Sequence, residues 1–304
     1  MIEGAPYAYW IAFHVLVFVL LVADLFVLQG KNHQLSVKAA WGWTAFLALL
    51  AGLFAVWILY SQGHQPALEF VSGYLIEMSL SVDNLFVFLL LFRSFSMKPA
   101  DQHRALLWGI AGAIVMRAIF IAVGVSLLNR FHWVQYVFGI ILLIAAIRLM
   151  RHSPEASDPS SPDASPSWIR WIKSRAGEPG DKLGMKTFLL IVLAVEITDL
   201  IFALDSIPAV LAVTRRPFIA YTSNIFAILG LRSLFFALSG FLDRFRLLHY
   251  GLAAILAFVA LKMLTVEFIT VPVGISLGII LLILAIFIVL SLKMPQKPAA
   301  TKGV

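Results

Sequence analysis

The chain has 304 residues, of which 61% are hydrophobic and 13% are charged, with a formal net charge of +7 and no cysteine. This composition excludes an ordinary soluble globular domain, and the missing cysteines exclude a disulfide framework or a thiolate metal site within these residues. The positive charge does not indicate nucleic-acid binding, because the sequence has no basic groove interleaved with aromatic residues. We therefore expect an integral membrane protein.

Apolar segments of about 20 residues, the length that crosses a hydrocarbon core, recur along the whole chain. The first lacks a basic region before it, so we expect a retained helix rather than a cleaved signal. Asp24 near its far end either contributes to a pathway or reaches the lipid headgroups. The predicted fold is all-α and polytopic, a single transmembrane domain over residues 1–304. Its nine spans are expected at about 7–28, 39–60, 67–92, 105–128, 133–150, 186–213, 218–240, 247–265 and 270–291.

Basic residues gather in the loops on one side of these spans. Of the 23 Lys and Arg residues, 16 lie in loops on one side and 3 in loops on the other. Because basic loops stay on the cytoplasmic side, we expect the N-terminus outside and the C-terminus in the cytoplasm. The net charge then reflects topology.

The segment 151–185 separates five spans from four. Its first half is rich in Pro and Ser and shows no apolar periodicity, which is typical of a flexible linker. We expect it on the cytoplasmic side.

An internal repeat is visible in the positions of the charged residues. "EMSLSVDNLF" places Glu77 six residues before Asp83, and "DLIFALDSIP" places Asp199 six residues before Asp205. The next span of each half carries an arginine. Residues 67–150 and 186–265 are therefore predicted to be three-helix repeats, and because three is odd, the second copy enters the membrane from the opposite side.

Five acids lie deep in these apolar spans, and each costs about 2.5–3.5 kcal/mol at the centre of a membrane helix. Arg117 and Arg232 also lie near mid-span, so ion pairs with two of the acids are expected. Arg148 and Lys262 are expected near cytoplasmic span ends, where they can reach the headgroups. Three carboxylates then lack a protein partner, so either some are protonated or a cation joins them. The five acids are Glu77, Asp83, Glu196, Asp199 and Asp205.

The spacing of the acids suggests how they are arranged. Glu196 and Asp199 are three residues apart, so they share a helix face. We predict a midplane site of Glu77, Glu196 and Asp199, with Asp83 on the cytoplasmic approach and Asp205 on the outer approach. Asn84, next to Asp83, supplies a neutral side-chain oxygen, and such oxygens are ligands of hard divalent cations.

Two further expectations concern the helices themselves. Pro208 removes a backbone donor, so the helix is expected to unwind around Asp205. Gly109, Gly112 and Gly124 in one span, and Gly230 and Gly240 in another, are expected to permit close helix packing.

The acidic segments "ALEFVSGYLIEMSLSVDNLFVFLLLF" and "EITDLIFALDSIPAV" resemble the TerC family of bacterial integral membrane proteins, and "VADLFVL" in the first span looks like its Alx-type branch. The family is associated with manganese export and, by name, with tellurium resistance. The resemblance implies Mn²⁺ ligands among the residues that match its acidic motifs. These are Glu77, Asp83, Asn84, Glu196, Asp199 and Asp205.

We therefore expect a secondary transporter that exports Mn²⁺ by alternating access, driven by proton exchange, with no resident cofactor. Ca²⁺ or a broader range of divalent cations remains an alternative, because the same oxygen ligands serve them. A stress protein whose acids only hold helices together through Arg117 and Arg232 is another. An enzyme is not expected, because the chain has neither a Gly-x-Gly-Asp segment nor a His-Glu-x-x-His motif.

Overall fold

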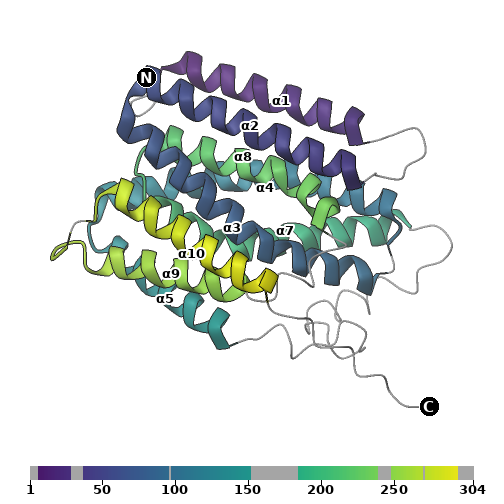
Figure 1. The fold of residues 1–304 in the computed structure, drawn as a ribbon. Coiled ribbons are helices and arrows are strands. Elements are labelled where there is room, and N and C mark those ends of the chain that lie inside the picture. Colours follow the sequence, from purple (N-terminus) through teal and green to yellow (C-terminus); the bar gives the residue numbers. More distant parts are fainter. Residues whose placement is uncertain are drawn as a thin grey trace, which may run out of the picture.

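The computed structural model describes residues 6–28, 37–95, 97–151, 184–238, 248–269 and 271–293. Within these ranges the chain is helical and has no strand, which confirms the all-α prediction. Most of the predicted linker lies outside the described residues. The helices, shown in Figure 1, are α1 (Tyr7–Leu28), α2 (Val37–Gln62), α3 (His64–Ser94), α4 (Pro99–Arg130), α5 (Val134–Arg151), α7 (Met185–Leu211), α8 (Pro217–Leu238), α9 (Leu248–Leu264) and α10 (Val273–Lys293).

Among the described helices, seven are long and apolar enough to cross a membrane: α1, α2, α4, α5, α7, α8 and α10. The helices α3 and α9 fall outside this set. Several acids interrupt the apolar sequence of α3, and α9 has only 17 residues. The side chains of Leu49 on α2 and Leu282 on α10 are 63% and 60% exposed. Large apolar side chains on the outside of a helical bundle are what lipid contact requires.

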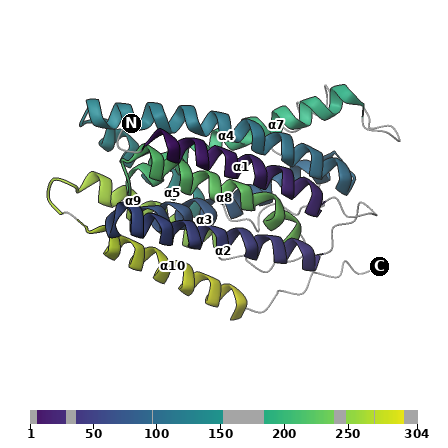
Figure 2. The same cartoon turned by 90° about the horizontal axis from the view of Figure 1, so that it is seen from above.

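The helix α8 forms the centre of the bundle. All residues from 218 to 235 are buried, and α8 packs against α1, α2, α3, α4 and α7. Figures 1 and 2 show it enclosed by its neighbours in two perpendicular views. Proline opens both α8 and α4, where its fixed φ suits the first helical position and its missing N–H costs no hydrogen bond.

The two predicted repeats pack in a reciprocal pattern. The first helix of the first repeat, α3, packs against the second helix of the second repeat, α8. In the same way, the first helix of the second repeat, α7, packs against the second helix of the first repeat, α4. The third helices, α5 and α9, pack against each other. A twofold relation between α3–α5 and α7–α9 would produce this pattern. The repeat itself remains a prediction.

One end of the bundle carries the short turns, and we call it the predicted outer end. Here α2 joins α3 at Gly63, whose φ of 98° lies in the left-handed region that favours glycine. Trp133 and Phe268 are exposed at this end, at 62% and 86%, as expected for aromatic residues at a membrane interface. Lys262 also lies here, donating to Ser276 Oγ at 3.0 Å. Its expected place at a cytoplasmic end is therefore wrong, because α9 runs toward the outer end.

Candidate functional site

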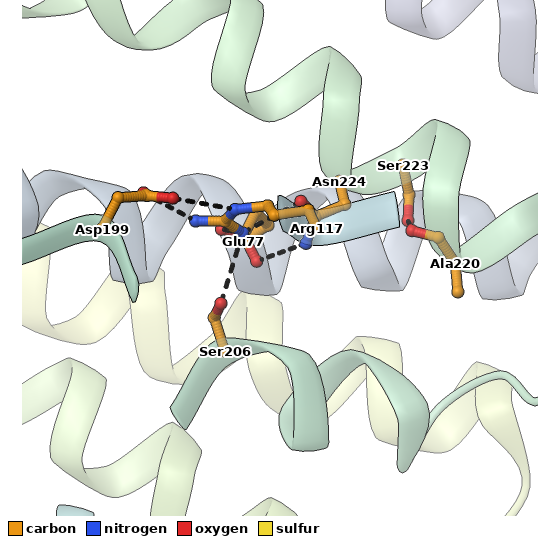
Figure 3. A network of polar contacts seen from close by, with 7 residues as sticks. All are labelled: Glu77, Arg117, Asp199, Ser206, Ala220, Ser223 and Asn224. Atoms are coloured by element: carbon orange, nitrogen blue, oxygen red, sulfur yellow. Dashed lines mark hydrogen bonds and ion pairs between the residues drawn. The ribbon is translucent and has the colours of Figure 1, made fainter. Parts of the chain in front are cut away.

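The deepest polar cluster lies where α3, α4, α7 and α8 meet. Glu77 comes from α3, Arg117 from α4, Asp199 and Ser206 from α7, and Asn224 from α8, and Figure 3 shows these side chains converging. Four helices from both predicted repeats therefore contribute to one polar centre inside an apolar bundle.

The Arg117 guanidinium holds the two carboxylates. Its Nη2 donates to Asp199 Oδ1 at 3.0 Å and its Nε to Oδ2 at 3.4 Å, while Nη1 donates to Glu77 Oε1. This planar fork matches the geometry of a carboxylate, which favours arginine over lysine at such a position.

Neutral groups complete the cluster. Nη1 of Arg117 also donates to Asn224 Oδ1 at 2.9 Å and Ser206 Oγ at 3.3 Å. The Asn224 amide donates to Glu77 Oε2 at 2.9 Å. Both oxygens of Glu77 are thus hydrogen-bonded, as a buried carboxylate requires.

Burial makes the charge balance of this cluster important. Glu77 and Arg117 are both 0% exposed, and Asp199 is 5% exposed. Two ionised carboxylates against one guanidinium leave one formal negative charge in excess. A proton or a further cation must neutralise it, since an uncompensated buried charge is strongly destabilising.

Glycines on α4 allow α7 to approach closely enough for this contact. A Cβ at Gly109 would lie 2.7 Å from Val195 Cγ1, and one at Gly124 would lie 2.6 Å from Leu211 Cδ1. The expectation of close helix packing is confirmed for Gly109 and Gly124. The close packing brings Asp199 within reach of Arg117. A Cβ at Gly230 would lie 3.7 Å from Met78 Cε, an ordinary contact, and Gly240 lies outside the described residues.

Glu196 does not join the Arg117 network. Its side chain is half-buried. A Cβ at Gly112 would lie 2.0 Å from Glu196 Oε1, so the carboxylate occupies the space that the glycine leaves open. It interacts electrostatically with Asp199 on the same helix, but it forms neither an ion pair nor a hydrogen bond to Arg117 in the described residues. The structure therefore brings together Glu77 and Asp199 from the predicted midplane set.

The remaining acidic-motif residues lie further along the same helices. Asn84 is buried in α3, and the side chain of Asp83 lies outside the described part of that helix. Asp205 is half-buried on α7, within the electrostatic reach of Arg148 on α5. None of the contacts described here joins Asn84 or Asp205 to the Arg117 cluster.

The prediction that α7 unwinds around Asp205 is wrong. The helix continues from Met185 to Leu211 with Pro208 inside it, and the Ala212 N–H donates to the Pro208 carbonyl at 2.9 Å. Because Pro208 lies close to the helix end, its missing donor costs a single hydrogen bond and the turn persists. Asp199 and Asp205 therefore stay on different faces of one continuous helix.

The expectation that Arg232 pairs with one of the five deep acids is wrong, because Arg232 pairs with Asp24, an acid from outside the predicted repeats. Its Nη2 lies 2.6 Å from Asp24 Oδ2 and donates to the Asp24 carbonyl at 2.8 Å, and both residues are buried. Asp24 therefore does not reach the headgroups. This pair fixes α1 against the central helix α8.

Asn224 is a site residue that sequence reasoning missed. It follows Thr222 and Ser223 in an otherwise apolar span, so three consecutive polar residues were the available signal. No group of three or more His, Cys, Asp or Glu side chains in the described ranges is placed to hold a metal ion. The oxygen donors that the structure brings together are two carboxylates, one amide and one hydroxyl.

Comparison with known proteins decides the family. Residues 62–299 match the model of the integral membrane protein TerC family. The chain belongs to this family. No solved structure gives a significant match.

Several TerC-like relatives match over almost their whole length. An "Uncharacterized membrane protein STKORF319" from Myxococcus xanthus is 43% identical over 95% of this chain and 93% of its own. A "Putative membrane-bound redox modulator Alx" from Salmonella typhi is 42% identical, with 93% of each chain covered. The Alx protein of Escherichia coli K12 is 40% identical, also over 93% of each.

Replacing Arg117 by Met is expected to destabilise this TerC-family protein by about 3–5 kcal/mol, because it leaves two buried carboxylates without their guanidinium. The measurement is thermal unfolding in lipid nanodiscs. Arg130→Met, at the exposed end of α4, is the matched control and should change little. Equal shifts of the unfolding temperature in the two variants would show that the buried ion pair stabilises the protein no more than an exposed arginine does.

Gly109→Ala is expected to destabilise by about 1–3 kcal/mol, since the new methyl group overpacks against Val195. Adding Val195→Ala should recover part of that loss by removing the Cγ1 atom that is contacted. The same unfolding assay applies to the single and double variants. If the two losses simply add, the close approach of α4 and α7 at Gly109 is not what limits packing.

Proposed function

We propose that the protein is a secondary transporter that moves divalent cations, most readily Mn²⁺, out of the cytoplasm by alternating access. The observation that supports this is the pair of carboxylates of Glu77 and Asp199, buried at the meeting point of both predicted repeats. Intramembrane acids at such a point are typical of ion pathways.

The donor set suits a hard divalent cation. Carboxylate oxygens with neutral amide and hydroxyl oxygens are the ligands that Mn²⁺, Ca²⁺ and Mg²⁺ prefer, and Asn224 and Ser206 supply the neutral ones. The motif acids Asp83, Glu196 and Asp205 would extend the pathway along α3 and α7. Ca²⁺ remains the alternative substrate, since oxygen ligands serve both ions.

Arg117 would act as a tethered counter-ion. Its guanidinium is bound by the same carboxylate oxygens that would ligate the cation, so Arg117 and the cation compete for Glu77 and Asp199. After release of the cation, the guanidinium neutralises one carboxylate and a proton neutralises the other. Proton exchange is therefore the proposed driving force.

The names of the Alx relatives state a redox role for those proteins. The 304 residues include no cysteine, so thiol–disulfide exchange is not a chemistry that they offer. We propose instead that a redox effect of this protein would follow from the movement of a redox-active cation such as Mn²⁺. The proposed location is the bacterial inner membrane, with the N-terminus outside.

The test is Mn²⁺ flux into a metal-quenched dye in proteoliposomes with an imposed pH gradient. Asp199→Asn and Glu77→Gln should each lower the flux by more than about 100-fold, since losing even an outer-shell partner costs about 10- to 100-fold in metal affinity. Ca²⁺ and Mg²⁺ as competitors rank the substrates.

Glu267→Gln is the matched control, because this acid is 56% exposed in the connection between α9 and α10. Its flux should equal that of the wild type. Absence of wild-type flux under every gradient, in folded protein, would contradict the proposal.

A structural role for the ion pair is the second candidate, and the complete pairing of Arg117 supports it. In that case the double variant Glu77→Arg with Arg117→Glu, which exchanges the two charges, should keep both the fold and the effect that the wild-type protein has in cells. A transport site would lose flux in the swapped protein, because the carboxylate moves to another helix.

A further inference from the structure

A second buried acid lies on α3, nearer the predicted outer end. Glu69 is 8% exposed, and its Oε2 accepts a hydrogen bond from Thr214 Oγ1 at 2.7 Å and lies 3.4 Å from Arg216 Nε. Gln65 Nε2 donates to its other oxygen at 3.3 Å. Thr214 and Arg216 belong to the turn between α7 and α8, the two helices that carry Asp199 and Asn224.

Glu69 shares a face of α3 with the deep acid Glu77. The two are eight residues apart, which is about 12 Å along the helix. Gly73 lies midway between them on the same face. A Cβ at Gly73 would lie 2.7 Å from Ser223 Oγ, so at this level α3 and α8 leave no room for a side chain.

Three residues with buried hydroxyl groups, one on α3 and two on α8, lie near the level of Gly73. Ser72, Thr222 and Ser223 are all 0% exposed. Thr222 and Ser223 donate to carbonyls of their own helix, which leaves lone pairs on their oxygens, and Ser72 Oγ has no hydrogen-bond partner in the described residues. Figure 3 shows Ser223 on α8, beside the cluster around Arg117.

The unpaired hydroxyl of Ser72 needs an explanation beyond packing. An unpaired buried hydroxyl costs free energy in an apolar bundle, whereas alanine would cost none. Of the three hydroxyl groups, that of Ser223 faces Gly73 at a level between the two carboxylates, and hydroxyl and carboxylate oxygens are ligands of hard divalent cations.

We propose that the seam between α3 and α8 is the outer half of the cation pathway, with Glu69 as its outer binding station. Arg216 and Thr214 close this station, and Gly73 and Ser223 form the constriction between it and the deep pair. This inference rests on the proposed transport function. The outer station repeats the chemistry of the deep one, because each carboxylate is held by an arginine that a divalent cation would displace.

The neighbouring Arg215 provides the matched control. It belongs to the same turn, but its Nη2 donates to Gln135 Oε1 on α5 at 2.8 Å. It lines a separate cavity of about 220 Å³ with Lys262 and Gln135. A change at Arg215 therefore alters the charge of the turn without touching Glu69.

The first experiment measures access to the seam and does not depend on transport. Because the chain has no cysteine, Ser223→Cys introduces a single thiol, which an impermeant maleimide can label from one side of sealed vesicles. Adding Arg216→Gln should speed labelling from the outer side by up to about fivefold, the effect of losing one partly exposed ion pair. Arg215→Gln should leave the rate unchanged.

Mn²⁺ should slow this labelling in the Arg216→Gln background, and Glu69→Gln should abolish that protection. Equal labelling rates with and without Arg216, or labelling only from the opposite side, would overturn the outer pathway. So would protection by Mn²⁺ that persists in Glu69→Gln.

The second experiment separates this inference from the transport proposal. Glu69→Gln should lower Mn²⁺ flux in proteoliposomes about tenfold while equilibrium Mn²⁺ binding to the deep pair changes less than about threefold. If the wild type transports and Glu69→Gln transports equally well, the outer station is wrong and the transport function stands. If the wild type does not transport, the proposed function itself fails.

Discussion

The ion pair that Arg117 forms with Glu77 and Asp199 is the constraint on which the rest of the bundle depends. A guanidinium with no exposed surface must be neutralised within the protein, because the bilayer offers no solvent to do it. Its partners come from α3 and α7, and α8 adds Asn224, so four helices must meet at one level. The glycines of α4 satisfy that requirement, since a side chain at Gly109 or Gly124 would push α7 away.

The central helix α8 shows how such a bundle is held together. Lipid tails are as apolar as leucine, so helix association in a membrane depends on close packing and polar contacts more than on burial of apolar surface. Along α8, Asn224 contacts Glu77 and Arg232 pairs with Asp24, while Arg216 in the turn before it pairs with Glu69. Two of these contacts reach α3, and the third reaches α1. Polar residues that would be costly in lipid therefore fix the position of the helix that is most enclosed.

The expectations that were wrong share a cause. Unwinding at Pro208 was inferred from a local rule, but the surrounding helices hold the turn and one lost hydrogen bond is tolerated near a helix end. Glu196 does interact electrostatically with Asp199 on the face that their spacing predicts, but it does not reach Arg117. The spacing gives a direction around the helix but not the neighbour at that position, and the neighbour is Gly112 of α4. For Lys262, the direction in which α9 crosses the bundle decides which end it occupies.

The sequence by itself determined where the helices lie, that Glu77 and Asp199 are deep, and the family to which the chain belongs. These follow from segment length, apolar composition and two acidic motifs, all of which are local properties. The tertiary structure decided the partners: that Arg117 takes both Glu77 and Asp199, that Arg232 takes Asp24, and that Asn224 joins the site. Partner choice depends on the rotation and spacing of packed helices, and the sequence does not record this directly, because apolar residues that face lipid and those that face another helix are the same residue types.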